Sequence, residues 1–174
     1  MDEKDILILA LLQQDARMPL KEIGEKVGLA APTVHERIQA MLRQNVISGF
    51  TTIIDPKKVN LDITSFIMLY FKTGGSLGDP KVIELINSIA DIQECFHLAG
   101  DEDLIIKIRT KNMTTLEDII LRLSKSGNFS RTKTIIALST VKETVALNLG
   151  HFIEKGTREK QERTRQAAVE TETA

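Results

Sequence analysis

Residues 32–43 have the spacing of an amphipathic helix with a polar outer side. Four apolar residues recur on one face, which we expect to be buried: Val34, Ile38, Met41 and Leu42. The other faces carry side chains that can donate to or accept from base edges and phosphates, namely Thr33, His35, Glu36, Arg37, Gln39 and Arg43. A solvated helix face has a similar composition, so the neighbouring elements must decide between these two interpretations.

The preceding residues favour a helix-turn-helix. Pro19 suits the first position of a helix in which three apolar residues recur at i, i+3 and i+7: Leu20, Ile23 and Val27. Gly28 ends that helix, and Pro32 opens the next one after only three residues. Two short amphipathic helices joined by such a turn form the helix-turn-helix motif, whose second helix enters the DNA major groove.

One more helix is expected before this pair, and a ribbon after it. Asp2 can cap a helix that runs to Leu12, with Asp5 as the second acid of a capping box. Residues 46–54 are rich in β-branched side chains and end at the turn Asp55-Pro56. We predict a short ribbon there, followed by a linker.

A second group of polar residues is the turn Gly100-Asp101-Glu102-Asp103. Three carboxylates in one turn repel one another and favour a cation nearby. Gly and Asp are also common in solvated hairpin turns, so the residue types alone leave both interpretations open.

Two other groupings suggest enzyme chemistry but lack its context. The run Gly74-Gly75-Ser76-Leu77-Gly78 matches a nucleophile elbow, yet the expected helix begins only at Asp79-Pro80, too late for that turn. Cys95 and His97 place two metal-ligand types on one strand face, but a zinc site needs three or four ligands. We expect a loop at 74–78, and we expect no catalytic residue, no metal and no cofactor.

Strands and helices alternate in the order βαββαβ from residue 61 to 148. The expected elements are a strand at 63–72, a helix from Asp79-Pro80 through Ile89, strands at 92–98 and 104–109, a helix from a capping box at Thr114 and Glu117 to Gly127, a strand at about 131–138, and a further extended segment at 141–147. This order is typical of the ferredoxin-like split βαβ fold, in which both helices cover one face of an antiparallel sheet. The first strand is apolar on both sides, so we expect self-association through the bare face.

Charge and composition exclude several classes of protein. The chain has 23 Lys and Arg against 24 Asp and Glu, which excludes a polymer that coats nucleic acid by charge alone. Residues 16–58, however, hold seven basic and four acidic side chains, a local net charge of +3. The single cysteine excludes a disulfide framework and favours a cytoplasmic protein. The longest apolar run, Ile6–Leu12, is far below the ~20 residues that cross a bilayer, and no signal peptide is expected.

Short motifs are spread from Asp5 to about Leu147. They are Asp5-Ile6-Leu7-Ile8-Leu9, Val27-Gly28-Leu29, Glu36-Arg37-Ile38, Val46-Ile47-Ser48-Gly49-Phe50, Glu94-Cys95, Gly100-Asp101-Glu102-Asp103 and Thr132-Lys133-Thr134. In this order and spacing they resemble the leucine-responsive regulatory protein/AsnC family of transcription regulators. One residue departs from the family pattern: Ala30 stands where the family usually has a capping Ser, a loss that typically costs ~1 kcal/mol.

The resemblance implies an α+β chain, with an N-terminal three-helix winged-type helix-turn-helix domain and a C-terminal ferredoxin-like βαββαβ domain. We place the first domain with its ribbon at 1–55, a linker at 56–62, the effector-binding and oligomerisation domain at 63–149, and a charged tail at 150–174. The implied partners are double-stranded DNA, further copies of the chain in dimers and octamers or larger species, and a small effector of the amino-acid class. No membrane partner is expected.

The resemblance also implies roles for individual residues. The effector would bind between dimers at Gly100, Asp101 and Asp103. Asp101 or Asp103 would contact its ammonium group, and the hydroxyls of Thr132 and Thr134 would contact its carboxylate. We expect a sequence-specific transcription regulator. Its base contacts would come from Thr33, His35, Glu36 and Gln39. Its phosphate contacts would come from Arg37 and Arg43.

Two alternatives share this architecture. Sirohaem decarboxylases have a similar two-domain arrangement but need cationic groups for a tetrapyrrole, which the acidic turn does not offer. An architectural DNA-binding protein without an effector is the other alternative.

Overall fold

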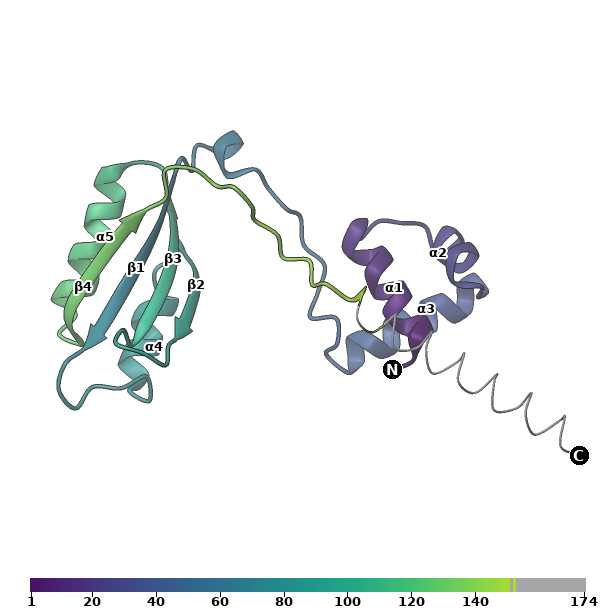
Figure 1. Ribbon diagram of the computed structural model, residues 1–174, viewed down its shortest axis with the longest axis horizontal. Helices are drawn as coiled ribbons and strands as arrows, with labels where there is room; N and C mark the ends of the chain where they lie inside the picture. The colour runs from purple at the N-terminus through teal and green to yellow at the C-terminus, as the bar shows by residue number, and fades with distance from the viewer. Residues whose placement is uncertain (151, 153–174) are drawn as a thin grey trace, which may run out of the picture. The chain divides into compact units, whose positions relative to one another are not determined.

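The computed structural model describes residues 1–150 and 152 of the 174-residue chain (Figure 1). It divides into two compact units, one formed by residues 1–52 with the segment that begins at Thr144, and one formed by residues 53–143. Of the tail predicted at 150–174, nearly all lies outside the described residues. The α+β fold class is confirmed.

The first unit contains the three expected helices. These are α1 (Glu3–Gln14), α2 (Leu20–Val27) and α3 (Ala31–Arg43). The capping box at the start of α1 is confirmed, because the Asp2 side chain accepts from the backbone N–H of Asp5 and the Asp5 side chain accepts from that of Asp2. Apolar side chains from all three helices form one core: Ile8, Ile23, Val27, Val34, Ile38 and Met41.

The turn between α2 and α3 is very close-packed. Gly28 adopts the left-handed conformation, with φ of 67°, and ends α2 as the sequence predicts. The backbone N–H of Leu29 donates to the carbonyl of Gly24 at 2.9 Å. A Cβ atom on Gly24 would lie 2.4 Å from the Leu29 carbonyl oxygen, so only glycine fits at this position. Ala30, the residue before α3, gives the helix no side-chain cap, as the departure from the family pattern predicts.

The ribbon predicted at 46–54 is not formed, and neither 46–54 nor 141–147 contains a strand. Both segments expose apolar side chains, among them Phe50, Ile53, Val141 and Val145. In the described part of the chain, neither segment forms with a neighbour the backbone hydrogen-bond ladder that a strand needs. The linker expected at 56–62 contains a short 3₁₀ helix, η1 (Pro56–Val59).

The second unit has the predicted ferredoxin-like fold. Its elements are β1 (Ile63–Phe71), α4 (Pro80–Asn87), β2 (Ile92–His97), β3 (Leu104–Thr110), α5 (Met113–Lys125) and β4 (Phe129–Ile136). The strands pair antiparallel in the order β2-β3-β1-β4. The capping box predicted at Thr114 and Glu117 is wrong: Asn112 caps α5 by accepting from the backbone N–H of Thr115 at 2.9 Å. The side-chain oxygen of Asn112 fills the cap two residues earlier than the threonine would.

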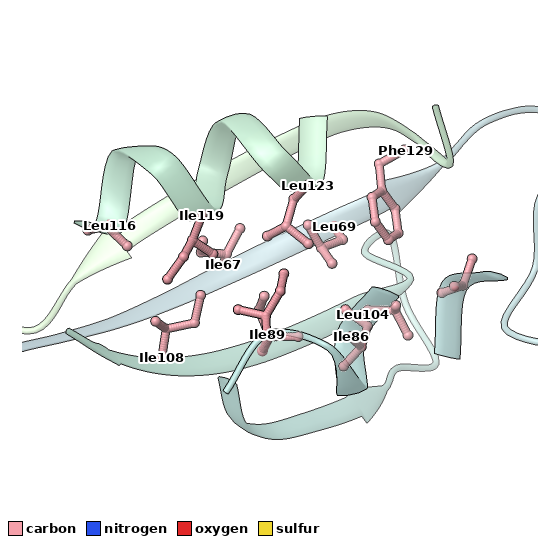
Figure 2. Close-up of a cluster of buried hydrophobic side chains, with 12 residues drawn as sticks. Ile67, Leu69, Ile86, Ile89, Leu104, Ile108, Leu116, Ile119, Leu123 and Phe129 are labelled. Atoms are coloured by element: carbon pink, nitrogen blue, oxygen red, sulfur yellow. The ribbon is translucent and has the colours of Figure 1, made fainter. Parts of the chain in front are cut away.

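The two faces of this sheet differ sharply. Side chains of α4 and α5 pack on one face against Ile67, Leu69 and Ile108, where Figure 2 shows Leu116, Ile119 and Leu123 pointing toward the strands. The residues that alternate with these core positions lie on the opposite face, which we call the open face. It carries an apolar centre of half-buried and exposed side chains: Phe66, Met68, Phe96, Ile105 and Ile135.

The close approach at Gly24 gives a first prediction. Gly24→Ala should destabilise the helix-turn-helix unit by about 1–3 kcal/mol, because the added methyl group meets a backbone carbonyl and the helices must separate. Gly49→Ala is the matched control, since a Cβ there meets nothing within 4 Å. Urea unfolding followed by circular dichroism measures both, and equal midpoints for the two variants would contradict the argument.

Candidate DNA-binding surface and effector site

One stripe of α3 faces away from the helical core. At about 100° per residue, Pro32, His35, Glu36, Gln39 and Arg43 fall along a single line on the helix surface. His35, Glu36 and Arg43 are exposed, and Gln39 is half-buried. Four of the six residues predicted to contact DNA therefore share this surface, which we call the α3 stripe.

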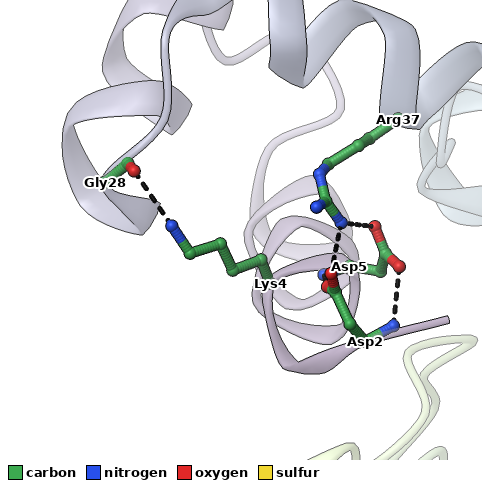
Figure 3. A network of polar contacts seen from close by, with 5 residues as sticks. All are labelled: Asp2, Lys4, Asp5, Gly28 and Arg37. Atoms are coloured by element: carbon green, nitrogen blue, oxygen red, sulfur yellow. Dashed lines mark hydrogen bonds and ion pairs between the residues drawn. The ribbon is translucent and has the colours of Figure 1, made fainter.

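Thr33 and Arg37 lie beside the α3 stripe rather than on it. Thr33 is half-buried on the flank of α3. Arg37 turns toward α1, where its Nη1 atom lies 2.7 Å from a carboxylate oxygen of Asp2 and 2.7 Å from one of Asp5 (Figure 3). The hydrogen bonds to Asp5 and Asp2 raise the pKa of Arg37, and its charge is neutralised within the unit. The residue predicted to bind phosphate is therefore already paired.

The acidic turn at 100–103 is only partly available to a ligand. Glu102 accepts a hydrogen bond from the Tyr70 hydroxyl at 3.1 Å. Asp103 accepts one from the backbone N–H of Phe71 at 2.7 Å and so fixes the end of the hairpin against β1. Gly100 and Asp101 are exposed, and no hydrogen bond to the Asp101 side chain is found in the part of the chain that the structure describes. Asp101 is thus the carboxylate best placed to meet an external cation.

Two residues beside this turn were missed by sequence reasoning. Arg131 donates to the Tyr70 hydroxyl at 3.2 Å, and its guanidinium carbon lies 4.4 Å from the centre of the Tyr70 ring. Tyr70 and Arg131 are directly opposite one another in the β1–β4 register. The chain Arg131–Tyr70–Glu102 therefore places a cation and an anion at one end of the open face.

Thr132 and Thr134 are not in contact with the turn. They pair with Leu69 and Ile67, so they share the helix-covered side of the sheet, and both are half-buried. They also lie on β4, an edge strand, with β1 between them and the hairpin. A ligand that contacts these two hydroxyls would have to bind at the β4 edge of the sheet.

A second charged group lies toward the other end of the open face. Glu143 pairs with both Lys107 and Arg109, and Lys107 also pairs with Glu94 at 2.9 Å. The hydrogen bonds from Lys107 and Arg109 hold the pKa of Glu143 below its ordinary value. No sequence pattern links these residues, because β3 and the segment after β4 meet only in the folded sheet.

The residues that suggested enzyme chemistry are not assembled into a site. Ser76 is exposed, and α4 begins four residues later with Asp79 as its cap. Burial raises the pKa of the Cys95 thiol, which keeps it protonated. Among the described residues, no group of three or more His, Cys, Asp or Glu side chains could hold a metal ion. Within the same residues, no helix is both long and apolar enough to cross a membrane.

The Tyr70 contacts give a spectroscopic prediction. Burial and the hydrogen bond to Glu102 raise the pKa of Tyr70, so its phenol should ionise above the ordinary pH of about 10. The stabilisation from the Tyr70–Glu102 hydrogen bond is then present below that pH and is lost as the pH rises through the raised pKa.

Ultraviolet absorbance reports this titration directly, because the chain has one Tyr and no Trp. Glu102→Ala should lower the pKa of Tyr70 toward its ordinary value, whereas Asp101→Ala, which removes the neighbouring acid, should change it little. An unchanged titration curve in Glu102→Ala would show that the hydrogen bond is absent in solution.

Comparisons with known proteins agree with both units. A family model described as the AsnC-type helix-turn-helix domain matches residues 1–42. A second, described as the Lrp/AsnC ligand binding domain, matches residues 64–147. The chain is 37% identical over 150 residues to the HTH-type transcriptional regulator FL11 of Pyrococcus horikoshii, a match that covers 84% of this chain and 95% of the relative.

Solved structures share the fold. The complex of a transcriptional regulator with L-Met from Neisseria meningitidis superposes with a TM-score of 0.82 at 22% identity, covering 87% of this chain and 99% of that one. AsnC of Escherichia coli gives a TM-score of 0.76 at 23% identity, with 84% and 97% covered.

The relatives are named as transcriptional regulators and not as enzymes, which removes the sirohaem-decarboxylase alternative. The two family models together span most of the chain, in the order and with the fold expected. The chain therefore belongs to the Lrp/AsnC family of transcriptional regulators, with a helix-turn-helix DNA-binding domain followed by a Lrp/AsnC ligand-binding domain.

Proposed function

We propose that the protein regulates transcription by binding a specific DNA sequence as a dimer, under the control of an amino-acid-class effector bound between dimers. The observation that carries the proposal is the α3 stripe, a row of polar side chains on the outer side of the second helix of the motif. Dimers would read a roughly palindromic site with half-sites one helical turn, or a multiple of it, apart.

The residues of the α3 stripe have complementary roles in this proposal. Gln39 can bond adenine, Glu36 can accept from the amino group of cytosine, and His35 can donate to or accept from base edges. Thr33 contacts a base from the flank, and Arg43, at the exposed end of α3, binds phosphate. Arg37 is not assigned to phosphate, because Asp2 and Asp5 already pair with it.

The effector is proposed to bind at the 100–103 turn. Asp101, beside Gly100, would take the ammonium group of an amino acid, with Asp103 holding the turn in place. Arg131 is the nearby cation for the ligand carboxylate. Thr132 and Thr134 are not assigned to this ligand, because they lie on the helix-covered side of the sheet. Support comes from the Neisseria meningitidis neighbour, which is itself a complex with L-Met.

Self-association is proposed to occur through the open face. Its apolar centre, with exposed Phe96 and Ile135, is what a second copy would cover, and dimers would assemble further into octamers or larger species. The effector would act by changing how dimers associate. The proposal includes a cytoplasmic location, supported by the single cysteine.

Arg43 tests the DNA-binding half of the proposal. The probe is the duplex that the wild-type protein enriches from a random-sequence pool, with a scrambled duplex for comparison. Arg43→Ala should weaken binding to both duplexes alike. It should also reduce the steepness of log K against log salt by about 0.9 for each bound subunit, because each subunit loses one phosphate contact. Lys125→Ala, on α5, removes the same charge outside the DNA-binding unit and should leave the slope unchanged.

Two outcomes would contradict this half of the proposal. An Arg43→Ala slope equal to that of the wild type would remove the phosphate contact. Failure of the wild-type protein to enrich any sequence would remove sequence-specific recognition.

Calorimetry with a panel of single amino acids tests the effector half. We expect at least one to bind, and Asp101→Asn to weaken its binding about tenfold through loss of the charged partner of the ammonium. Asp118→Asn, an equal charge change on the exposed side of α5, should bind like the wild type. If no amino acid binds, the architectural alternative without an effector replaces this half of the proposal.

A further inference from the structure

We infer that the first turn of α1 positions the recognition helix. Three residues of that turn, Asp2, Lys4 and Asp5, contact both helices of the helix-turn-helix motif (Figure 3). We call them the N-terminal clasp. The inference rests on the proposed function, because it concerns how α3 is presented to DNA, and it gives a role to residues outside the DNA-facing surface.

The clasp holds α3 through Arg37. A single guanidinium nitrogen, Nη1, lies 2.7 Å from both Asp2 and Asp5. The Asp5 side chain is only 13% exposed and that of Arg37 29%, whereas that of Asp2 is 54% exposed. Solvent therefore screens the Asp2 contact more, and Asp5 is the stronger partner.

The clasp holds α2 through Lys4. The Lys4 ammonium donates to the backbone carbonyl of Gly28 at 3.0 Å, at the left-handed residue that ends α2. An ammonium suits this place because the last carbonyls of a helix lack partners within the helix and carry partial negative charge. The first turn of α1 thus contacts both the end of α2 and the middle of α3.

These contacts add a polar constraint on α3 to the one that its buried side chains Val34, Ile38 and Met41 already provide in the core. The contact of Gly24 with Leu29 fixes the two helices where they are closest. The start of α3 has no side-chain cap, since Ala30 offers no hydrogen bond there. Arg37 projects from the flank of α3, beside the α3 stripe, so its ion pairs oppose rotation of α3 about its own axis. Such a rotation would move every base-contacting side chain at once.

The negative charge of Asp5 lets an experiment separate positioning from simple electrostatics. Asp5 is an anion in a DNA-binding unit, so electrostatics alone predicts that neutralising it strengthens binding to every duplex. Positioning predicts instead that the preference for the enriched sequence falls, whatever happens to affinity for scrambled DNA. The ratio of the two affinities separates these effects, because a general change of charge alters both affinities together.

The experiment compares Asp5→Asn with Glu25→Gln in the full-length protein. Glu25 is an exposed acid on α2 and gives the same change of charge without touching the clasp. The probes are the duplex enriched by the wild type and its scrambled counterpart, with circular dichroism as the check on folding. We expect the affinity ratio to fall about tenfold in Asp5→Asn, equivalent to one misplaced base contact, and to stay at the wild-type value in Glu25→Gln.

Two further variants keep the test decisive if Asp5→Asn proves poorly folded. Lys4→Met should lower the ratio in the same direction, since it frees the end of α2. Arg37→Gln should lower the ratio while leaving the salt slope unchanged, whereas a phosphate contact by Arg37 would reduce the slope by about 0.9.

The outcomes distinguish the clasp from the function. A wild-type ratio in Asp5→Asn, or a reduced salt slope in Arg37→Gln, overturns the clasp while sequence-specific binding stands. If the wild type enriches no sequence, both proposals fall.

Discussion

The arrangement of the DNA-binding unit depends on one neutralised charge, the guanidinium of Arg37 between Asp2 and Asp5. Because this cation is satisfied internally, the local net charge of +3 over residues 16–58 overstates what is available to phosphates. The α3 stripe itself carries a single arginine or lysine, Arg43, so the proposed affinity for DNA must also come from base contacts and from several units acting together. The acids at the start of α1 are part of the frame that holds α3.

In the second unit, the ferredoxin-like fold leaves one sheet face without helices. Apolar side chains occupy its centre, the Arg131–Tyr70–Glu102 chain lies near one end, and the Glu143 ion pairs lie toward the other. An effector near the acidic turn would therefore bind beside the surface proposed for self-association. A protein whose DNA affinity depends on assembly can be controlled by a ligand at that boundary.

The elements that follow from local spacing were predictable, and the contacts between distant residues were not. Apolar periodicity and Gly28 fixed α2 and α3, and strand alternation indicated the sheet and its bare face. The ion pairs of Arg37 were not predictable, because its partners lie more than thirty residues away in the chain. Tyr70 and Arg131 meet only through the β1–β4 register. The ribbon predicted at 46–54 was wrong, because β-branched composition alone does not supply a partner strand.

The most direct test is a crystal structure of the protein bound to its enriched duplex. The account predicts that Arg37 keeps its contacts with Asp2 and Asp5 while His35, Glu36, Gln39 and Arg43 line the side of α3 that faces the groove. An Arg37 guanidinium turned away from both acids and onto a phosphate oxygen would contradict it.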